Sequence, residues 1–397
     1  MQYCDDSPRH RWGASVRILM VSDVSFPRVN GVSTSIATFR QTLSELGHPS
    51  TLIAPEYRGT APDPADILRI PARAVPLDPE DRLMSSRALR RLEATLREGS
   101  YDVVHIHTPF VAHYAGVALA RRLGLPVIET YHTFFEEYFH HYAPFLPGWL
   151  TRRIARSMTV SQCRAVDSLV VPSPQMLSKL REYGVETPAE VLPTGIDAAR
   201  FRGGDGARFR AAHGIPADRP MLVHISRVAH EKNIDFILRM LSHVVRTVPD
   251  VLLVIAGEGP ALGHLKAMVG RLGLRANVQF VGYLDRSTTL LDCYRAGHAF
   301  VFASRTETQG LVLLEALALG TPVISTAVMG TADVLKDAQG ALVVEENEAA
   351  FAEAVIRVLH TPQLRSELAA KAPADAQSWS ALAMAERLVK LYASLKA

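Results

Sequence analysis

The sequence predicts an α/β protein made of two doubly wound domains, each with a parallel sheet covered by helices on both faces. Two observations lead to this fold class. The chain has 397 residues, which is more than one hydrophobic core usually supports. Short apolar runs alternate with helical patterns in two separate series, as parallel strands and crossover helices do. We therefore expect two Rossmann-like domains joined by a linker near residues 195–197.

The composition excludes several classes of protein. Hydrophobic residues make up 48% of the chain and charged residues 21%, as in an ordinary globular protein, so we expect disorder only near the ends. A formal net charge of +3 is too small to indicate nucleic acid as a partner. Residues 1–14 have little apolar content, which predicts a frayed tail and no secretory signal.

Cysteine and hydropathy patterns indicate a cytoplasmic protein. Cys4, Cys163 and Cys293 are far apart and lack metal-ligand spacing, so we interpret them as reduced thiols. No uninterrupted apolar run reaches the roughly 18 residues that a membrane-spanning helix needs. Any contact with a membrane is therefore expected to be peripheral.

The first series covers residues 15–194. Residues 16–21 are apolar apart from Arg17, which predicts a strand buried on both faces, and a helix over about 33–46 ends at Gly47. The same rhythm predicts strands over 50–54, 103–106, 126–130 and 169–171, and helices over 112–123 and from Ser173 to Gly184. This alternation is the βαβ pattern of a parallel sheet.

The second series covers residues 198–376. It predicts strands over residues 221–225, 251–256, 278–281, 300–303, 322–325 and 341–344. A final amphipathic helix follows over residues 379–397. Its apolar positions at helical spacing are Leu382, Ala385, Leu388, Leu391 and Tyr392. This apolar face must pack on another element.

A cationic loop follows the first strand of the second series. It reads Ser226-Arg227-Val228-Ala229-His230-Glu231-Lys232-Asn233 and precedes a predicted helix. Arg227, Lys232 and the N-terminus of that helix would form a diphosphate site without any metal. The alternative is that both are solvated surface cations, and their position after a strand favours the site.

Two carboxylates lie in the segment 306–316. Glu307 is in the loop after the strand over 300–303, at the edge where ligands of open α/β sheets bind. Glu315 falls inside the apolar helix over 311–319, where an unpaired charge is costly, so it needs a partner such as a pair of hydroxyls. The alternative is a capping role for Glu307 and a buried ion pair for Glu315.

In this order and spacing, the motifs resemble those of the family-4 retaining glycosyltransferases, whose GT-B fold has two Rossmann-like domains facing across a cleft. In the second domain the resemblance rests on Arg227 with Lys232, Gly257-Glu258-Gly259-Pro260, Phe280-Val281-Gly282-Tyr283, and Glu307 with Glu315. In the first domain it rests on Phe26-Pro27-Arg28-Val29-Asn30-Gly31-Val32 and Tyr131-His132-Thr133. It spans the chain from Val16 onward and implies that the last helix crosses back to the first domain.

The resemblance implies a donor site in the second domain. Arg227 and Lys232 would neutralise the diphosphate of a nucleoside diphosphate sugar. Glu315 would accept hydrogen bonds from the ribose hydroxyls, and Glu307 would face the transferred sugar. Because the two cations would neutralise the diphosphate, no metal and no other cofactor is expected.

Backbone groups complete the implied donor site. The amides of Gly310, Leu311 and Val312 would approach the sugar and the phosphates, as suits a helix start that contains glycine. Gly31 would let the first-domain loop approach the diphosphate when the domains close.

Two polar residues of the first domain follow predicted strands. His132 resembles the family histidine that contacts the donor sugar near the reacting carbon, and a structural histidine is the alternative. Asp23, at the end of the first strand, is a candidate for contact with the acceptor hydroxyl. Its alternative role is to cap the next segment.

A basic stretch in the first domain, residues 138–164, is the candidate acceptor surface. It has no acidic residue, and Trp149, Arg152, Arg153 and Arg156 lie in it. Its further aromatic and apolar residues include Phe139, Tyr142, Phe145, Leu146, Leu150 and Ile154. Such a surface would attract anionic lipid headgroups.

A second arginine group lies on a predicted helix. It consists of Arg87, Arg90, Arg91 and Arg97, and Glu93 and Glu98 accompany it. An ordinary solvated face is the alternative to a lipid-binding role for this group.

Within the family, segment 306–315 and loop 26–32 resemble the branch that glycosylates diacylglycerol or related lipids. This implies transfer of glucose from UDP-glucose to a membrane lipid, with retention of configuration, at the inner face of the membrane. GDP-mannose-dependent transfer to a lipid or a soluble glycan is the alternative. An alternative of another class is a nucleotide-sugar epimerase or a non-catalytic sugar-nucleotide binding protein.

Overall fold

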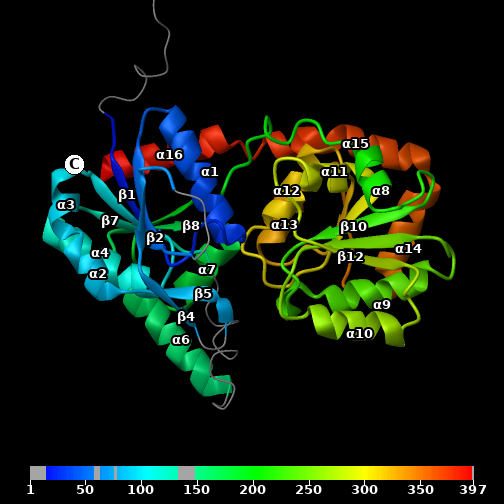
Figure 1. Ribbon diagram of the computed structural model, residues 1–397, viewed down its shortest axis with the longest axis horizontal. Helices are drawn as coiled ribbons and strands as arrows, with labels where there is room; N and C mark the ends of the chain where they lie inside the picture. The colour runs from blue at the N-terminus through cyan, green and yellow to red at the C-terminus, as the bar shows by residue number, and fades with distance from the viewer. Residues whose placement is uncertain (1–14, 58–62, 76–77, 133–147, 396–397) are drawn as a thin grey trace, which may run out of the picture. The chain divides into compact units, whose positions relative to one another are not determined.

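The computed structural model describes residues 15–57, 63–75, 78–132 and 148–395. The chain divides into two compact units, one of Met1–Gly195 with Ala381–Ala397 and the other of Ile196–Ser380. Each unit has a parallel sheet between two layers of helices (Figure 1). The predicted fold class, two doubly wound α/β domains, is therefore confirmed.

The sheet of the first unit has the order β3-β2-β1-β6-β7-β8-β9 in the described part of the chain, and all neighbours are parallel. Its strands are β1 (Ile18–Val21), β2 (Ser50–Pro55), β3 (Ile67–Ile70), β6 (Val103–Ile106), β7 (Val127–Thr130), β8 (Ser168–Val171) and β9 (Ala189–Val191). In β1, Ile18 and Met20 face one hydrophobic core, and Leu19 and Val21 face the other. Burial on both faces explains why this strand is apolar throughout.

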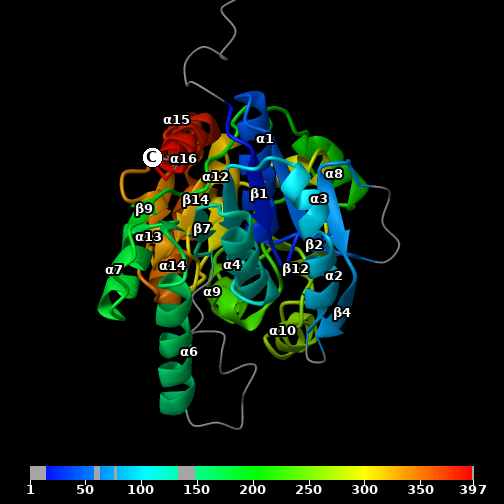
Figure 2. The ribbon, with the colours of Figure 1, turned by 90° about the vertical axis from the view of Figure 1, so that its left-hand side faces the viewer.

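Helices cover both faces of this sheet. One face carries α1 (Gly31–Glu45) and α16 (Ala381–Ser394). The other carries α2 (Ser86–Arg91), α3 (Glu93–Glu98), α4 (Val111–Leu123), α7 (Pro174–Glu182) and the C-terminal end of α6 (Gly148–Cys163). Figure 2 shows α6 extending away from the sheet of its own unit.

Some elements of the first unit differ from the prediction. Not predicted from the sequence are β3, β9 and the antiparallel hairpin of β4 (Ala72–Val75) and β5 (Asp78–Met84). The reason is local: β9 reads Ala-Glu-Val, and β5 contains a proline and four charged residues, so neither has the apolar run of a buried strand.

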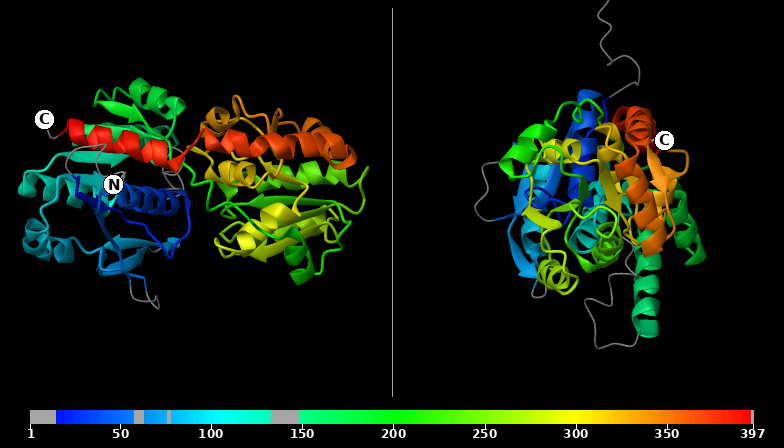
Figure 3. Two further views of the ribbon diagram at one scale, coloured as in Figure 1. Left: turned by 90° about the horizontal axis from the view of Figure 1, so that it is seen from above. Right: turned by 90° about the vertical axis from the view of Figure 1, so that its right-hand side faces the viewer.

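The sheet of the second unit has the order β12-β11-β10-β13-β14-β15, again all parallel. Its strands are β10 (Met221–Ile225), β11 (Leu252–Ala256), β12 (Val278–Gly282), β13 (Ala299–Phe302), β14 (Val323–Ser325) and β15 (Ala341–Val343). All of them lie where the apolar runs predicted strands. Figure 3 shows this sheet between its helices.

One face of this second sheet is covered by α9 (Ile234–Val244), α10 (Leu262–Arg271) and α14 (Glu348–His360). The other is covered by α8 (Gly206–Ala212), α11 (Thr289–Ala296), α12 (Leu311–Ala318), α13 (Gly330–Leu335) and α15 (Pro362–Gln377). A short 3₁₀ turn, His230–Lys232, precedes α9, so the cationic loop enters its helix through this turn.

The last helix, α16, packs on the first unit. Ala385, Leu388, Val389 and Tyr392 share a core with residues of α1, and Figures 1 and 3 show the two helices side by side. Polar contacts add to this packing, because the Tyr392 hydroxyl lies 2.6 Å from His105 Nδ1 in β6. The apolar stripe read from the sequence is thus the buried face of α16, whereas Leu382 is 50% exposed.

Replacing Leu388 with alanine should destabilise the first unit by about 2–5 kcal/mol, because the change leaves a cavity in a closed core. The matched control is Leu382→Ala on the exposed side of the same helix, which should change stability by less than about 0.5 kcal/mol. Hydrogen exchange of β1 and β6 peptides at increasing urea concentrations measures both. Equal effects of the two variants would contradict the packing of α16.

Candidate functional site

The candidate donor residues lie where the sheet of the second unit changes direction. From β10 the chain proceeds through β11 and β12 on one side and through β13 to β15 on the other. Since β10 and β13 are parallel neighbours, the loops after their carboxyl ends meet at one edge of the sheet. Open α/β sheets bind ligands at this position.

The loop after β10 is packed tightly against the loop after β11. A Cβ atom on Gly257 would lie 1.9 Å from the Ser226 carbonyl oxygen, and one on Gly259 would lie 2.3 Å from that of Val228. The Val228 amide donates to the Glu258 carbonyl at 2.8 Å. Only glycine permits this approach, so the Gly-Glu-Gly-Pro motif holds the loop that carries Arg227.

The structure brings Lys232 and Glu307 into contact. Lys232 Nζ donates to Glu307 Oε1, and both side chains are mostly buried. On the same loop Arg227 Nη1 lies 3.5 Å from Glu231 Oε1. Two predicted cations and one predicted carboxylate therefore meet at this edge, and each cation has an acidic neighbour.

Helix α12 begins shortly after Glu307 in the chain, and a glycine precedes its first residue. Gly310 adopts a left-handed conformation with φ of +83° and provides no side chain to cap the helix. The first amides of α12, which include those of Leu311 and Val312, carry the positive end of the helix dipole. Such an end is suited to bind an anion.

Glu315 is buried in α12, and its partners are protein side chains. Arg286 Nη2 donates to Glu315 Oε1, and the Tyr294 hydroxyl donates to Oε2 at 3.0 Å. Glu315 in turn raises the pKa of Arg286, and burial raises that of Tyr294 well above its usual value. The ion pair, one of the two alternatives for Glu315, is thus present, and its contact with ribose stays a prediction.

In the first unit, Asp23 lies at the corresponding change of direction between β1 and β6. Its carboxylate accepts from the Thr108 hydroxyl at 2.9 Å and from the Ala112 amide at 3.0 Å. Burial raises its pKa from 3.8 to about 6. Asp23 therefore binds the first turn of α4, which is a different segment from the one that we expected it to cap.

The side chains of three histidines, His105, His107 and His132, lie next to one another near the same edge. His107 Nδ1 lies 3.3 Å from His132 Nε2, and the rings of His105 and His107 are 4.1 Å apart. Burial lowers the pKa of His132 to about 4 and that of His105 to about 3, and it lowers the pKa of His107 as well. These side chains are therefore neutral at pH 7.

His107 is a polar residue near this edge that was not predicted from the sequence. Its Nε2 is buried and has no hydrogen-bond partner among the described residues. A buried polar atom of this kind marks a place where a ligand group can bind. The signal was a further polar residue close to the end of a strand: His107 directly follows β6, and His132 lies two residues after β7.

Gly31, predicted to approach the diphosphate, is the first residue of α1. Asn30 caps the helix by accepting from the Ser33 amide at 2.9 Å. A Cβ atom on Gly31 would meet nothing within 4 Å, so space is open beside it. Its approach to the donor stays a prediction.

The predicted acceptor surface lies on α6. Trp149 is 68% exposed, and Arg152, Arg153 and Arg156 are exposed as well. The guanidinium of Arg156 already makes one hydrogen bond within the protein, because its Nη2 donates to the Glu182 carbonyl at 2.8 Å. The predicted residues Phe139, Tyr142, Phe145 and Leu146 lie outside the described residues. Among the described helices, none has the length and apolar character needed to cross a bilayer.

Two protein-family models together match most of the chain. The protein-family model Glycosyltransferase Family 4 matches residues 29–200, and Glycosyl transferases group 1 matches residues 205–375. Alpha-monoglucosyldiacylglycerol synthase of Streptococcus pneumoniae is 34% identical over 318 residues, or 78% of this chain and 71% of that protein. The protein of the same name from Acholeplasma laidlawii is 23% identical, over 96% and 97% of the two chains.

A solved structure shares the fold. Sucrose-phosphate synthase of Thermosynechococcus elongatus matches with a TM-score of 0.77 at 21% identity, over 96% of this chain and 99% of that one. At this identity the likeness concerns the arrangement of strands and helices.

The buried histidines predict that acid destabilises the first unit. A histidine whose pKa is lower in the folded state stabilises the fold fully above pH about 6.5, and it loses this contribution as the pH falls toward the folded value. For His105 that value is about 3. Asp23 affects the pH dependence of stability in the opposite direction, because its contribution to stability is lost as the pH rises from 3.8 through about 6.

We therefore expect the thermal unfolding temperature of the first unit to decrease as the pH is lowered from 7 to 5. The variant His105→Gln should show a smaller decrease. His360→Gln, at an exposed position on α14, is the control and should keep the dependence of the wild type. Thermal unfolding at a series of pH values is the measurement. An unchanged slope in His105→Gln would show that this imidazole does not titrate between the two states.

Proposed function

Since the chain belongs to the family-4 glycosyltransferases and has their GT-B fold, we propose that it transfers glucose from UDP-glucose to diacylglycerol. The proposal rests on one observation above all: Lys232 and Glu307 pair beside the Gly310 helix start, at the ligand-binding edge of the second sheet. The name of the Streptococcus pneumoniae relative supports diacylglycerol as the acceptor.

The donor half of the proposal follows from the charges at the second sheet edge. A diphosphate would place negative charge beside Arg227, Lys232 and the first amides of α12. Glu307 would then turn from Lys232 to the hydroxyl groups of the sugar. Because two cations and a helix end neutralise the leaving group, we infer that the reaction needs no metal.

In the proposed reaction, the bond between the anomeric carbon and the diphosphate oxygen breaks. A bond to the acceptor oxygen forms on the same face of the sugar, and the acceptor proton passes to the leaving diphosphate. The neutral His132 and His107 would donate to or accept from substrate hydroxyls. Asp23 would contact the acceptor hydroxyl, and the Thr108 hydroxyl and the Ala112 amide hold its carboxylate in place.

The acceptor is a lipid, so the proposal includes peripheral association with the cytoplasmic face of an anionic membrane. On α6 the exposed Trp149 can enter the headgroup region, while Arg152 and Arg153 are attracted to anionic headgroups. This basic helix would bring the first unit to its substrate.

The proposed function is tested by transfer from radiolabelled UDP-glucose, UDP-galactose and GDP-mannose, with and without vesicles that contain diacylglycerol. We expect labelled glycolipid from UDP-glucose, with a rate that EDTA changes by less than about twofold. Labelled glycolipid from GDP-mannose would show that the donor is GDP-mannose and not UDP-glucose. Conversion of the donor without vesicles would indicate an epimerase, and label on water or a soluble sugar alone would exclude the lipid acceptor.

Glu307→Ala and Lys232→Ala should each lower kcat by roughly 10²–10³-fold, because both lie at the ligand-facing ends of loops. The control is Arg239→Ala, which removes an ion pair with Glu348 on the surface of the same unit. It should leave kcat unchanged. Circular dichroism confirms that each variant is folded. Full activity in either site variant would contradict the donor site.

A further inference from the structure

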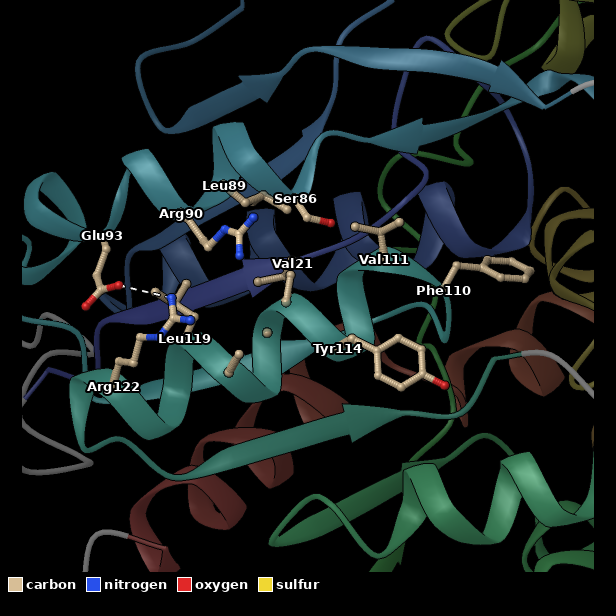
Figure 4. A pocket seen from close by; sticks show the side chains of 13 residues that line it. Val21, Ser86, Leu89, Arg90, Glu93, Phe110, Val111, Tyr114, Leu119 and Arg122 are labelled. Carbon is tan, nitrogen blue, oxygen red and sulfur yellow. Dashed lines mark hydrogen bonds and ion pairs between the residues drawn. The ribbon is translucent and has the colours of Figure 1, made fainter.

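A groove lies in the first unit between α4 and the two short helices α2 and α3. Its volume is about 440 Å³, within the range of small-molecule sites. Figure 4 shows side chains of α2, α3 and α4 around it, with Val21 of β1 at its floor. None of the residues assigned to the donor site or to the α6 surface lines this groove.

Small residues on α4 create the groove. Gly116 brings the helix close to the sheet, because a Cβ atom there would lie 2.7 Å from Ile106 Cγ1. Ala115 and Ala118 of the same helix also line the groove, and their small side chains leave it open. Both are partly exposed. Leu89 of α2 and Leu119 of α4 complete apolar walls.

The groove runs along α4 and starts beside Asp23. Phe110 and Val111 line one end, and the following amide, that of Ala112, donates to the Asp23 carboxylate. At the other end Arg122 Nη1 donates to Glu93 Oε2 at 3.1 Å. The stretch from Phe110 to Arg122 spans about 18 Å at the rise of an α-helix. The shape is therefore a channel from the proposed acceptor position to a polar end.

Two aromatic side chains, Phe110 and Tyr114, line the groove toward the end near Asp23. Phe110 is 39% exposed and Tyr114 is 59% exposed, although both line the groove. Exposed aromatic side chains are costly in water and suit a lipid interface. Arg90 also lines the groove and is exposed, and the methylene stem of such a side chain can add apolar surface.

We propose that this groove receives one acyl chain of the diacylglycerol acceptor. The chain would lie along Ala115 and Ala118, with the glycerol end emerging at Phe110 near Asp23. A long, narrow and mostly apolar groove with aromatic side chains at one end fits a hydrocarbon chain. Because this end lies near the proposed acceptor position, we assign the groove to the acceptor lipid and not to other membrane lipids. This inference rests on the proposed function.

The main variant is Ala118→Phe, which fills the groove from a partly exposed position. Ala115→Leu is a milder version, and Ala94→Phe on the exposed side of α3 is the matched control. With dipalmitoylglycerol as acceptor, we expect Ala118→Phe to lower kcat/KM at least roughly tenfold, and Ala94→Phe to leave it unchanged. Binding of UDP and circular dichroism should be the same in all variants.

A further variant separates an acyl chain from an anionic headgroup as the occupant. Arg90→Leu keeps the apolar wall and removes the charge, so transfer to dipalmitoylglycerol should be retained. Loss of transfer in Arg90→Leu would mean that the groove binds a headgroup, and it would overturn the proposal. Equal kcat/KM for wild type and Ala118→Phe would also overturn it.

Photolabelling tests the groove without relying on turnover. A diacylglycerol with a diazirine in one acyl chain should label peptides that contain residues 86–93 or 110–122, and Ala118→Phe should lose this label. Phosphatidylcholine with the same diazirine should not label these peptides. Label elsewhere, or equal label from both lipids, would reject the groove as the acyl-chain site. If wild type labels there but transfers no sugar, the proposed function fails and the groove assignment stands.

Discussion

The parallel pairing of β10 with β13 is the constraint on which the candidate donor site depends. Lys232 and Glu307 are 75 residues apart in the chain, and they meet because the loops after these two strands open at the same edge. The first unit repeats the arrangement with β1 and β6, where Thr108 binds Asp23 from 85 residues away. Hydrogen bonding within the two sheets thus positions the polar residues of both units.

Charges at the second sheet edge are compensated in pairs. Lys232 binds Glu307, and the buried Glu315 binds Arg286. Pairing of this kind is what permits ionised groups in a poorly solvated site, because a buried charge without a partner is costly. For Glu315 the Tyr294 hydroxyl adds a second contact, which holds the carboxylate within α12. The polar groups at this edge are therefore paired with one another.

Helix α4 connects two features of the first unit. Its first turn receives the Asp23 carboxylate, and its body forms one wall of the groove. Both depend on the close contact of Gly116 with Ile106, which sets the distance between the helix and the sheet. The polar position at the strand ends and the apolar channel beside it are therefore held by one element. The proposed acceptor has both a hydroxyl group and hydrocarbon chains, and this helix would serve both.

The sequence by itself determined the two α/β units and most of their strands, because a buried parallel strand is a local apolar run that needs no knowledge of its neighbours. It also located Arg227, Lys232 and Glu307, since each follows such a strand. The tertiary structure alone decided which of these residues meet. It supplied Arg286 and Tyr294 to Glu315, and it placed the polar hairpin strands that lack an apolar pattern. Partners far apart in the chain become neighbours only through strand order and helix packing, and neither is written in the local periodicity of the sequence.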